Sequence, residues 1–237
     1  MSKKKKIVLI TGASSGIGKS LALKLSSKGY ELILSSRKID LLNEVVDNVS
    51  SLGGKAHAIQ MDITNSNSVE ALFIKSKEIG FVDVVVNNAG FGKFDKIQNI
   101  NIEDWDAQLS VNLRGSFLIT KFFSETMIQK KKGMFVYINS VAGKKAYPYS
   151  SAYVASKFGL LGFSRSMRAE LREYNIKVVS VHPGAVDTAF WDNVEGDFPR
   201  SEMMDPENVS NSIVHAICVP DNMVIEELNI QRTKGDF

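Results

Sequence analysis

Short runs rich in β-branched residues alternate with longer helical patterns, and this alternation limits the possible folds of the chain more than any other feature. Seven runs are expected to be strands: Ile7–Ile10, Glu31–Leu34, Ala56–Gln60, Val82–Val86, Met134–Ile138, Val178–Val181 and Val224–Ile230. Repeated strand-helix-strand units place the strands parallel and cover both faces of the sheet with helices. We therefore expect an α/β fold with a doubly wound, seven-stranded parallel sheet.

The helices are expected between these strands, at Ile17–Lys28, Leu41–Leu52, Ser68–Lys77, Glu103–Lys130, Ala152–Tyr174 and Pro206–Ala216. Three of these helices begin with capping signals. Asn67 stands before Glu70, and Asn101 stands before Asp104, each at the spacing of a capping box. Asp205 precedes a proline at the first helical position. These signals predict where three of the helices start.

No internal repeat, low-complexity segment or Pro/Gly/Ser-rich linker divides the chain, so we expect a single domain over residues 1–237. One irregular stretch, residues 184–204, follows a strand directly and carries Phe190, Trp191 and Phe198 without a clean period. A loop of this length in a compact α/β domain is usually functional and often covers a site. We expect it to be the substrate loop.

The composition is that of an ordinary globular protein, with 44% apolar and 23% charged residues, and it indicates neither a nucleic-acid nor a membrane partner. The net charge of +3 rests on short runs at Lys3–Lys6, Lys130–Lys132 and Lys144–Lys145, which we interpret as solvated tail and loops. The first apolar run ends at Ile10, and no later run approaches the roughly 18 residues of a membrane helix. Cys218 is the only cysteine, so no intrachain disulfide is expected and a reducing, cytoplasmic location fits.

Three glycines, Gly12, Gly16 and Gly18, stand where the first strand turns into the first helix. At this position the backbone can approach a pyrophosphate, and the N-terminus of the helix faces its negative charge. The loop therefore predicts a dinucleotide site lined by Gly12, Ser14, Ser15, Gly16, Ile17 and Gly18. The stretch also ends like an ATP-binding P-loop, but Ala13 stands where that motif needs its first glycine.

The end of the second strand predicts the choice of cofactor. Units that bind NAD usually carry Asp or Glu about 20 residues after the glycines, where it accepts a hydrogen bond from the ribose. Here the strand ends Ser35-Ser36-Arg37-Lys38. Ser36 can hydrogen-bond a 2′-phosphate, and the planar guanidinium of Arg37 can pair with it. We therefore expect NADP(H) rather than NAD(H); the alternative is that Arg37 is a plain solvated residue before a helix.

Further motifs follow in order along the chain: Asn87-Asn88-Ala89-Gly90, Asn112, Ser140, Tyr153 with Lys157 one helical turn on, and Pro183-Gly184. Together with Thr11 and the glycine loop, and over nearly the whole chain, they resemble the short-chain dehydrogenase/reductase family. The resemblance implies a single Rossmann-type domain, a nicotinamide cofactor, and a catalytic group of Asn112, Ser140, Tyr153 and Lys157. It also implies that Asp62 meets the adenine, that Asn88 and Gly90 line the cofactor ribose, and that Gly184 and Thr188 belong to the loop that holds the carboxamide and phosphates.

Tyr153 is the only one of six tyrosines with a lysine four residues on. One helical turn puts the ammonium of Lys157 beside the phenol, and oxidised nicotinamide would add a second positive charge. Both charges favour the phenolate and so lower the pKa of the phenol from its usual value of about 10. Our hypothesis is that Tyr153 is the general acid in reduction and the general base in oxidation, while Lys157 lowers its pKa and holds the nicotinamide ribose. Ser140 would bind the substrate oxygen, and by resemblance Asn112 would hold a water in the proton path.

These observations predict an NADP-dependent oxidoreductase acting on a small carbonyl or alcohol that Ser140 and Tyr153 contact. A 3-oxoacyl-thioester reductase of fatty-acid synthesis is the alternative within the family, although the chain lacks the Asp-Gly-Gly close usual in those reductases. The alternative from another class is a non-catalytic nucleotide-binding regulator on the same fold. A serine hydrolase is disfavoured, since Ser140 lacks the Gly-x-Ser-x-Gly elbow.

The substrate pocket is expected to be lined by Phe91, Phe94, Ala142, Tyr147, Tyr149, Phe190 and Trp191, which favours an apolar or aromatic ligand body. His57, His182 and His215 are scattered without a metal-ligand spacing, so we interpret them as structural and expect no metal. The family resemblance also implies a homodimer or homotetramer formed through the two long helices, with the altered C-terminus against the tetramer.

Overall fold

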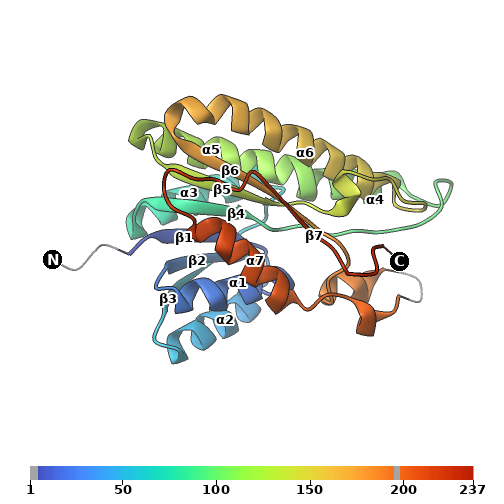
Figure 1. Ribbon diagram of the computed structural model, residues 1–237, viewed down its shortest axis with the longest axis horizontal. Coiled ribbons are helices and arrows are strands. Elements are labelled where there is room, and N and C mark those ends of the chain that lie inside the picture. The colour runs from blue at the N-terminus through green and yellow to red at the C-terminus, as the bar shows by residue number, and fades with distance from the viewer. Residues whose placement is uncertain (1–4, 195–197, 237) are drawn as a thin grey trace.

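Seven parallel strands form one sheet in the part of the chain that the structure describes, residues 5–194 and 198–236 of a computed structural model (Figure 1). The strands are β1 Ile7–Thr11, β2 Glu31–Ser36, β3 Lys55–Gln60, β4 Val82–Asn87, β5 Gly133–Ile138, β6 Ile176–Pro183 and β7 Glu227–Ile230. They lie in the order β3-β2-β1-β4-β5-β6-β7, with every neighbouring pair parallel. The predicted fold class is therefore confirmed.

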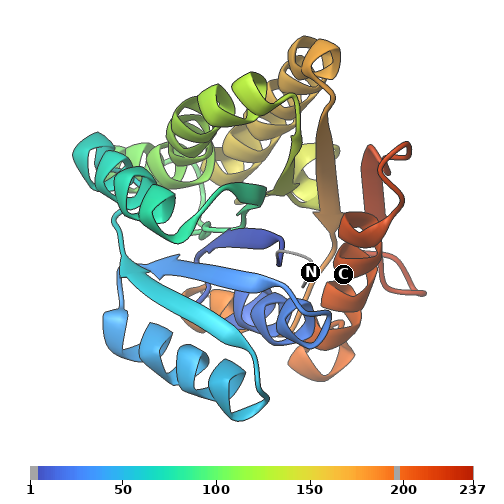
Figure 2. The same ribbon diagram turned by 90° about the vertical axis from the view of Figure 1, so that its left-hand side faces the viewer.

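Helices cover both faces of this sheet. They are α1 Gly16–Ser27, α2 Ile39–Ser51, α3 Ser66–Ile79, α4 Ile102–Leu109, α5 Gly115–Lys130, α6 Ser151–Leu171 and α7 Pro206–Cys218. Helices α1, α2 and α7 lie on one face, and α3, α5 and α6 lie on the other (Figure 2). Each crossover from one strand to the next parallel strand thus passes over a face of the sheet, as the alternation of patterns predicts.

The core is divided between the two faces by the pleat of the strands. In β1, Val8 and Ile10 pack toward α1, α2 and α7, whereas Ile7 and Leu9 pack toward α3, α5 and α6. All four side chains are at most 2% exposed. A strand buried on both faces needs apolar residues at consecutive positions, which explains why its sequence does not alternate.

The single helix predicted over Glu103–Lys130 is interrupted. A π-helical turn over Ser110–Arg114 separates α4 from α5 and carries the buried Asn112. The Asn112 amide is bonded to the backbone of Phe91 and to Ser156 on α6, and these contacts hold the turn in its wider form. A sequence pattern of period 3.6 does not reveal such a local insertion.

Other element ends also differ from prediction. The cap of α3 is Asn65 rather than Asn67, because its Oδ1 accepts from the amides of Asn67 and Ser68 at 2.9 and 3.2 Å. The caps at Asn101 and Asp205 are confirmed. Strand β7 begins at Glu227, later than the predicted Val224. The helix expected to reach Tyr174 ends at Leu171, and a 3₁₀ turn follows it.

The lysine runs are exposed where the structure describes them, as expected. Lys3 and Lys4 lie outside the described residues. Lys144 and Lys145 also form ion pairs at the surface, Lys144 with Glu227 at 2.6 Å and Lys145 with Asp236 at 2.8 Å. In the described part of the chain, no helix combines the length and apolar character needed to cross a membrane.

Candidate active site

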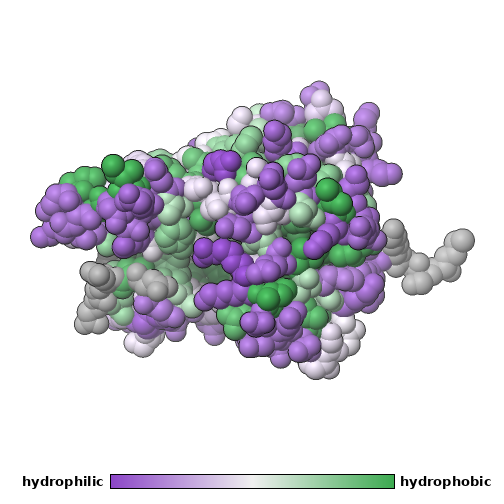
Figure 3. Space-filling view, turned by 180° about the vertical axis from the view of Figure 1, so that it is seen from behind, coloured by the Kyte–Doolittle hydropathy of each residue, from purple (hydrophilic) through white to green (hydrophobic). Residues whose placement is uncertain are grey.

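A cleft of about 1290 Å³ opens along the carboxyl edge of the sheet. The chain runs outward in opposite directions from β1 and β4, and parallel sheets of this kind bind ligands at that point. The glycine loop, the segments after β2, β4, β5 and β6, and the C-terminal segment all contribute to its walls. Seen from behind, the surface is hollowed below a projecting lobe at one end of the molecule (Figure 3).

The glycine loop forms one wall of the cleft in a conformation that needs glycine. Gly12 and Gly16 have φ angles of +64° and +53°. A Cβ atom on Gly12 would lie 2.9 Å from the Cα of Ala89, and one on Gly16 would lie 3.1 Å from the Cβ of Thr188. The loop therefore leaves a backbone surface open to a ligand at the start of α1.

Gly18 differs from the other two glycines because it faces away from the cleft lining. A Cβ on Gly18 would overlap the carbonyl oxygen of Gly12 and the side-chain nitrogen of Asn88. The residue thus allows α1 to pack closely on β1. Gly18 is absent from the cleft lining, and its contact with a cofactor stays a prediction, whereas Ser14, Ser15 and Ile17 line the cleft.

Asn88 ties the glycine loop to the segment after β4. Its Nδ2 donates to the carbonyl oxygens of Thr11 and Gly12 at 2.9 and 3.0 Å. The Thr11 hydroxyl oxygen accepts from the amides of Asn88 and Ala89, both at 3.1 Å. Asn88 and Gly90 both line the cleft, but the amide of Asn88 is already bonded within the protein.

The far end of the cleft brings together the residues predicted to select the cofactor. Ser36, Arg37 and Asp62 all line it, and the side chain of Arg37 is exposed there. Asp62 Oδ1 accepts from the amide and hydroxyl of Thr64 at 2.9 and 2.7 Å. These bonds, with a smaller contribution from the charge of Arg37, lower the pKa of the Asp62 carboxyl. The carboxylate is therefore ionised at neutral pH.

Ser140, Tyr153 and Lys157 come together at the opposite end. Ser140 follows β5 and caps a 3₁₀ turn over Val141–Gly143, and its Oγ accepts from the amide of Ala142 at 3.1 Å. The Ser140 side chain also lies close enough to the Tyr153 hydroxyl to lower its pKa. Lys157, which is 4% exposed, donates from Nζ to the carbonyl of Ile138 at 3.0 Å. The three predicted groups thus share one site.

The expectation that Lys157 lowers the pKa of Tyr153 is wrong for the protein without a bound cofactor. Burial raises the pKa of Tyr153 to about 12, and the neighbouring Ser140 hydroxyl offsets this only in part. Lys157 Nζ lies over the phenol ring, 5.6 Å from its centroid. Burial also lowers the pKa of Lys157 to about 8. Desolvation therefore outweighs the attraction of an ammonium for a phenolate here.

Asn112 lies behind the site and does not line the cleft. Its Oδ1 accepts from the amide of Phe91 at 3.0 Å, and its Nδ2 donates to the carbonyl of Phe91 and to Ser156 Oγ at 2.9 and 3.0 Å. Gly90 passes directly over it, since a Cβ there would lie 3.1 Å from Asn112 Oδ1. Asn112 joins the π turn, the segment after β4 and helix α6 behind Tyr153 and Lys157.

Aromatic rings surround Tyr153. Its ring centroid lies 5.5 Å from that of Phe94 and 5.6 Å from that of Phe190, both edge-on. Trp191 packs on Phe190 at 5.4 Å and on Phe198 at 4.7 Å. All the residues predicted for the substrate pocket line the cleft. Offset and edge-on ring contacts suit an aromatic ligand.

The loop over residues 184–204 is more regular than predicted where the structure describes it. A parallel bridge joins Val186 to Met204, and short 3₁₀ turns lie between them. Arg200 pairs with Asp187 at 2.5 Å and Asp192 at 2.9 Å, which closes the base of the loop. Residues 195–197 lie outside the described part. Gly184 and Thr188 line the cleft, as predicted.

Sequence reasoning missed the contribution of the C-terminal segment. Gln231, Arg232, Gly235 and Asp236 line the cleft. The Asp236 carboxylate accepts from the Tyr147 hydroxyl at 2.8 Å and binds Lys145. The available signal was a polar segment directly after a strand that ends at the ligand-binding edge. Among residues 5–194 and 198–236, no three His, Cys, Asp or Glu side chains come together as a metal site.

The same fold occurs in a solved structure of similar sequence. An alcohol dehydrogenase from the archaeon Thermococcus sibiricus, complexed with 5-hydroxy-NADP, superposes with a TM-score of 0.90. It is 28% identical, and the match covers 97% of each chain. The arrangement of the sheet and its helices is therefore shared over nearly the whole length.

Relatives and a family match extend this likeness. A sepiapterin reductase of Chlorobaculum tepidum is 35% identical over 98% of both chains. A 3-oxoacyl-[acyl-carrier-protein] reductase of Synechocystis is 34% identical over 87% of both chains. Residues 6–197 match the family described as short chain dehydrogenase. The chain therefore belongs to the short-chain dehydrogenase family of oxidoreductases, which use nicotinamide cofactors.

Proposed function

We propose that the protein reduces a small carbonyl compound, and oxidises the corresponding alcohol, with NADP(H) as the cofactor and Tyr153 as the proton donor and acceptor. One observation carries the proposal: the neighbouring hydroxyls of Ser140 and Tyr153 share a cleft with the glycine loop and the exposed Arg37. The first pair suits a carbonyl oxygen, and the second suits a dinucleotide with an additional phosphate.

The residues of the cleft fit a nicotinamide dinucleotide. Gly12 and Gly16 form a cradle that a Cβ atom would fill, at the N-terminus of α1. Arg37 and Ser36 would hold a 2′-phosphate, and Asp62 would receive the adenine. Gly90, Gly184 and Thr188 would line the path toward Tyr153 and Lys157. A bound cofactor supplies the hydride, and the protein supplies position and one proton.

The raised pKa of Tyr153 supports action in the direction of reduction. A phenol with a pKa of about 12 keeps its proton at neutral pH and is ready to donate it to a carbonyl oxygen. Ser140 would donate a second hydrogen bond to that oxygen and stabilise its developing negative charge. Lys157 would bind the ribose hydroxyls beside the phenol. Asn112 would hold Phe91 and the π turn in place behind them.

The aromatic end of the cleft supports a planar substrate. Phe94 and Phe190 stand beside Tyr153, with Trp191 packed on both, and the three rings would pack against a ring next to the reacting carbonyl. The relative named sepiapterin reductase makes sepiapterin a rational first compound. The relative named 3-oxoacyl-[acyl-carrier-protein] reductase supports a second candidate, a 3-oxoacyl thioester. We favour the planar ketone, because an acyl chain would form weaker contacts with these aromatic rings than another aromatic ring would.

The test is NADPH consumption with sepiapterin, aryl ketones, aldehydes and 3-oxoacyl thioesters, and with NADH as the control cofactor. We expect turnover with at least one carbonyl compound, a higher kcat/KM for the aromatic ketones, and a preference for NADPH. No turnover with any compound, despite measured NADPH binding, would instead support a nucleotide-binding regulator. A higher kcat/KM for the 3-oxoacyl thioesters would make them the favoured substrate class in place of the planar ketones.

We also propose that the whole chain acts as one domain, in the cytoplasm, as a homodimer or homotetramer. Phe117 on α5 is 44% exposed and Phe158 on α6 is 45% exposed, which supports contact between copies along these helices. Analytical ultracentrifugation at micromolar concentration measures the oligomeric state directly, and a monomer would contradict the proposal.

A further inference from the structure

His182 is a buried histidine next to the catalytic serine turn. It lies near the end of β6, is 0% exposed, and its Nδ1 is 3.2 Å from the carbonyl oxygen of Ser140. A carbonyl oxygen only accepts hydrogen bonds, so this contact is attractive only when Nδ1 carries the proton. In that tautomer Nε2 carries a lone pair, and it lies 4.0 Å from Glu227 Oε2, beyond hydrogen-bond range.

The carbonyl of Ser140 receives a second bond from its own turn. The amide of Gly143 donates to it at 3.0 Å, so the two bonds occupy both lone pairs of the oxygen. On the other side, the amide of Ser140 donates to Asn139 Oδ1 at 2.9 Å. The peptide groups on both sides of Ser140 are thereby fixed. Because the Cα position and the side-chain direction follow the backbone, these bonds fix where the Ser140 hydroxyl points.

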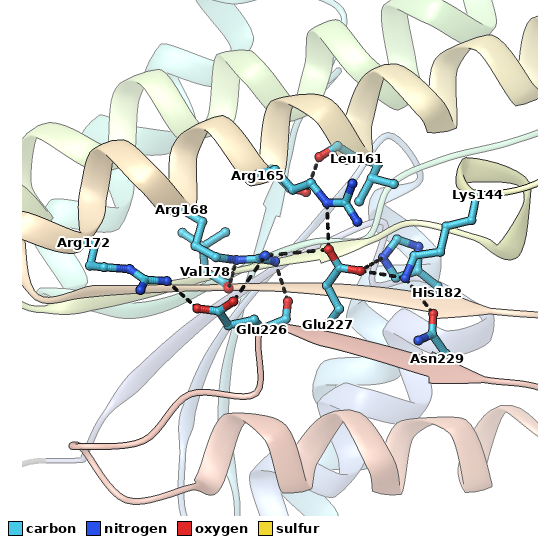
Figure 4. A network of polar contacts seen from close by, with 11 residues as sticks. Lys144, Leu161, Arg165, Arg168, Arg172, Val178, His182, Glu226, Glu227 and Asn229 are labelled. Atoms are coloured by element: carbon cyan, nitrogen blue, oxygen red, sulfur yellow. Dashed lines mark hydrogen bonds and ion pairs between the residues drawn. The ribbon is translucent and has the colours of Figure 1, made fainter.

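Charged side chains hold the far end of the same turn. Lys144 follows the 3₁₀ turn, and its Nζ donates to Glu227 at 2.6 Å and to Asn229 at 2.9 Å, both on β7. Figure 4 shows these side chains beside His182, with Arg165 of α6 on the other oxygen of Glu227. The turn that carries Ser140 is thus attached to β6 at its start and to β7 at its end.

Lys144, Glu227 and Arg165 face the imidazole. Burial, the charge of Lys144 and, to a smaller extent, that of Arg165 lower the pKa of His182 to about 4, although the Ser140 carbonyl and the Glu227 carboxylate act in the opposite direction, so the ring is neutral at pH 7. A neutral ring has one N–H group, and that group is engaged by the Ser140 carbonyl. The interpretation of His182 as a histidine of the core therefore leaves out a specific contact with the reaction centre.

We propose that His182 is a positioning residue for the reaction: the Nδ1–H group fixes the Ser140 carbonyl and so sets the Ser140 hydroxyl against Tyr153. The inference rests on the proposed function, since it assigns His182 to that same reaction. His182 would orient Ser140 during turnover. This role requires the proton to be on Nδ1, whereas a side chain that only fills space in the core requires no particular tautomer.

Two near-isosteric substitutions test the role. In His182→Asn the amide nitrogen can occupy the place of Nδ1 and donate to Ser140, whereas His182→Leu fills similar space without a donor. We expect His182→Leu to lower kcat at least about tenfold with little change in NADPH affinity. We expect His182→Asn to keep most of the wild-type kcat. His182→Gln carries its amide at the place of Nε2 and should resemble Leu. His215→Gln, on the exposed face of α7, is the control for loss of a histidine.

Three results would overturn the proposal. Equal kcat for the Asn and Leu variants at equal thermal stability would show that the hydrogen bond does not matter for turnover. Higher activity of Gln than of Asn would assign the working atom to Nε2. The third result is an effect confined to KM.

Long-range ¹H–¹⁵N NMR gives a readout that needs no substrate. We expect the Nδ1–H tautomer for His182, assigned by its disappearance in His182→Asn. The Nε2–H tautomer would overturn the proposal, because Nδ1 could not then donate to Ser140. If no carbonyl compound is turned over but the Nδ1–H tautomer is found, the proposed function fails while the contact stands. The two failures are therefore distinguishable.

Discussion

Burial controls the pKa of both ionisable groups at the proposed reaction centre, Tyr153 and Lys157. It raises the pKa of Tyr153 to about 12 and lowers the pKa of Lys157 to about 8. Both shifts favour the neutral forms, as desolvation does for any charge. The phenol therefore keeps its proton at neutral pH, while the ammonium of Lys157 is the group of the two that titrates closer to neutral pH. The pH dependence of the site should follow the lysine.

Reduction should weaken as Lys157 loses its charge. In the folded protein this happens as the pH rises through about 8, so kcat/KM for carbonyl reduction should fall above that pH. Over the interval from about 8 to 10.5 the unfolded chain binds more protons than the native one, so this residue alone makes stability rise with pH there. A pH profile of kcat/KM between 6 and 10 checks the first statement. A flat profile up to pH 10 would contradict it.

Arg37 should determine the preference between the two cofactors. The change Arg37→Asp removes a charge-assisted partner of the 2′-phosphate and adds a repelling carboxylate, so the KM for NADPH should rise about tenfold or more. The KM for NADH should fall or stay constant, because its ribose carries a hydroxyl that Asp can accept from. Steady-state kinetics with both cofactors measure this. An unchanged KM for NADPH would mean that Arg37 is an ordinary solvated residue.

Connections between elements give the site its shape. Asn88 joins the loops after β1 and β4, Thr188 packs on Gly16 from the loop after β6, and Glu227 joins β7 to α6 through Arg165. Each of these contacts spans segments far apart in the chain. A substitution at a contact that lines the cleft should therefore weaken ligand binding, whereas a substitution at a contact away from the cleft should lower only the stability of the fold.

The glycine loop should be sensitive to a methyl group. Gly16→Ala puts a Cβ at a φ of +53° and 3.1 Å from Thr188, so we expect a loss of stability of about 1–2 kcal/mol together with weaker NADPH binding. Gly53→Ala is the matched control, since it has a φ of +76° and nothing within 4 Å. It should lose similar stability and keep NADPH affinity. Fluorescence titration with NADPH compares them, and equal affinities would contradict a role of the loop in binding.

The ion pairs of Glu227 should stabilise the protein in a pH-dependent way. Arg165 and Lys144 lower the pKa of Glu227 to about 2 from 4.5, so its contribution is complete above about 4.5 and is lost as the pH falls through 2. Glu227→Gln should therefore lower the Tm at pH 7, and the difference from wild type should shrink below pH 4.5. Glu226→Gln, whose side chain is 42% exposed, should cost less. An equal Tm difference at pH 7 and pH 3 would contradict this.

At the scale of the whole molecule, the sequence predicts the sheet and the edge that binds ligands, but not the exact course of the chain between elements. Strands buried on both faces, such as β1, have an unmistakable apolar pattern, and the glycines after β1 mark the ligand-binding edge. The π turn around Asn112 was not predicted, because the side-chain contacts with Phe91 and Ser156 that hold it are far away in sequence. The C-terminal wall around Asp236 was missed for the same reason.

The pKa of Tyr153 shows a second limit of sequence reasoning. The spacing to Lys157 predicts a neighbouring charge, and the two residues are indeed neighbours. Whether that charge outweighs burial depends on how many groups exclude water, and Phe94 and Phe190 come from segments on either side of the site. The spacing in the sequence identifies Lys157 as the neighbour of Tyr153, but whether the pKa of Tyr153 rises or falls depends on the assembled fold.

The central claim is that Tyr153 transfers the proton, and its most direct measurement is the turnover of Tyr153→Phe with the best carbonyl substrate and NADPH. We expect kcat to fall by about 10²- to 10⁴-fold while NADPH binding stays unchanged, because only the hydroxyl is removed. Tyr137→Phe, which removes a buried hydroxyl bonded to Thr120 of α5 at 2.8 Å in the core and outside the cleft lining, should keep its activity. A Tyr153→Phe variant with near wild-type kcat would contradict the account.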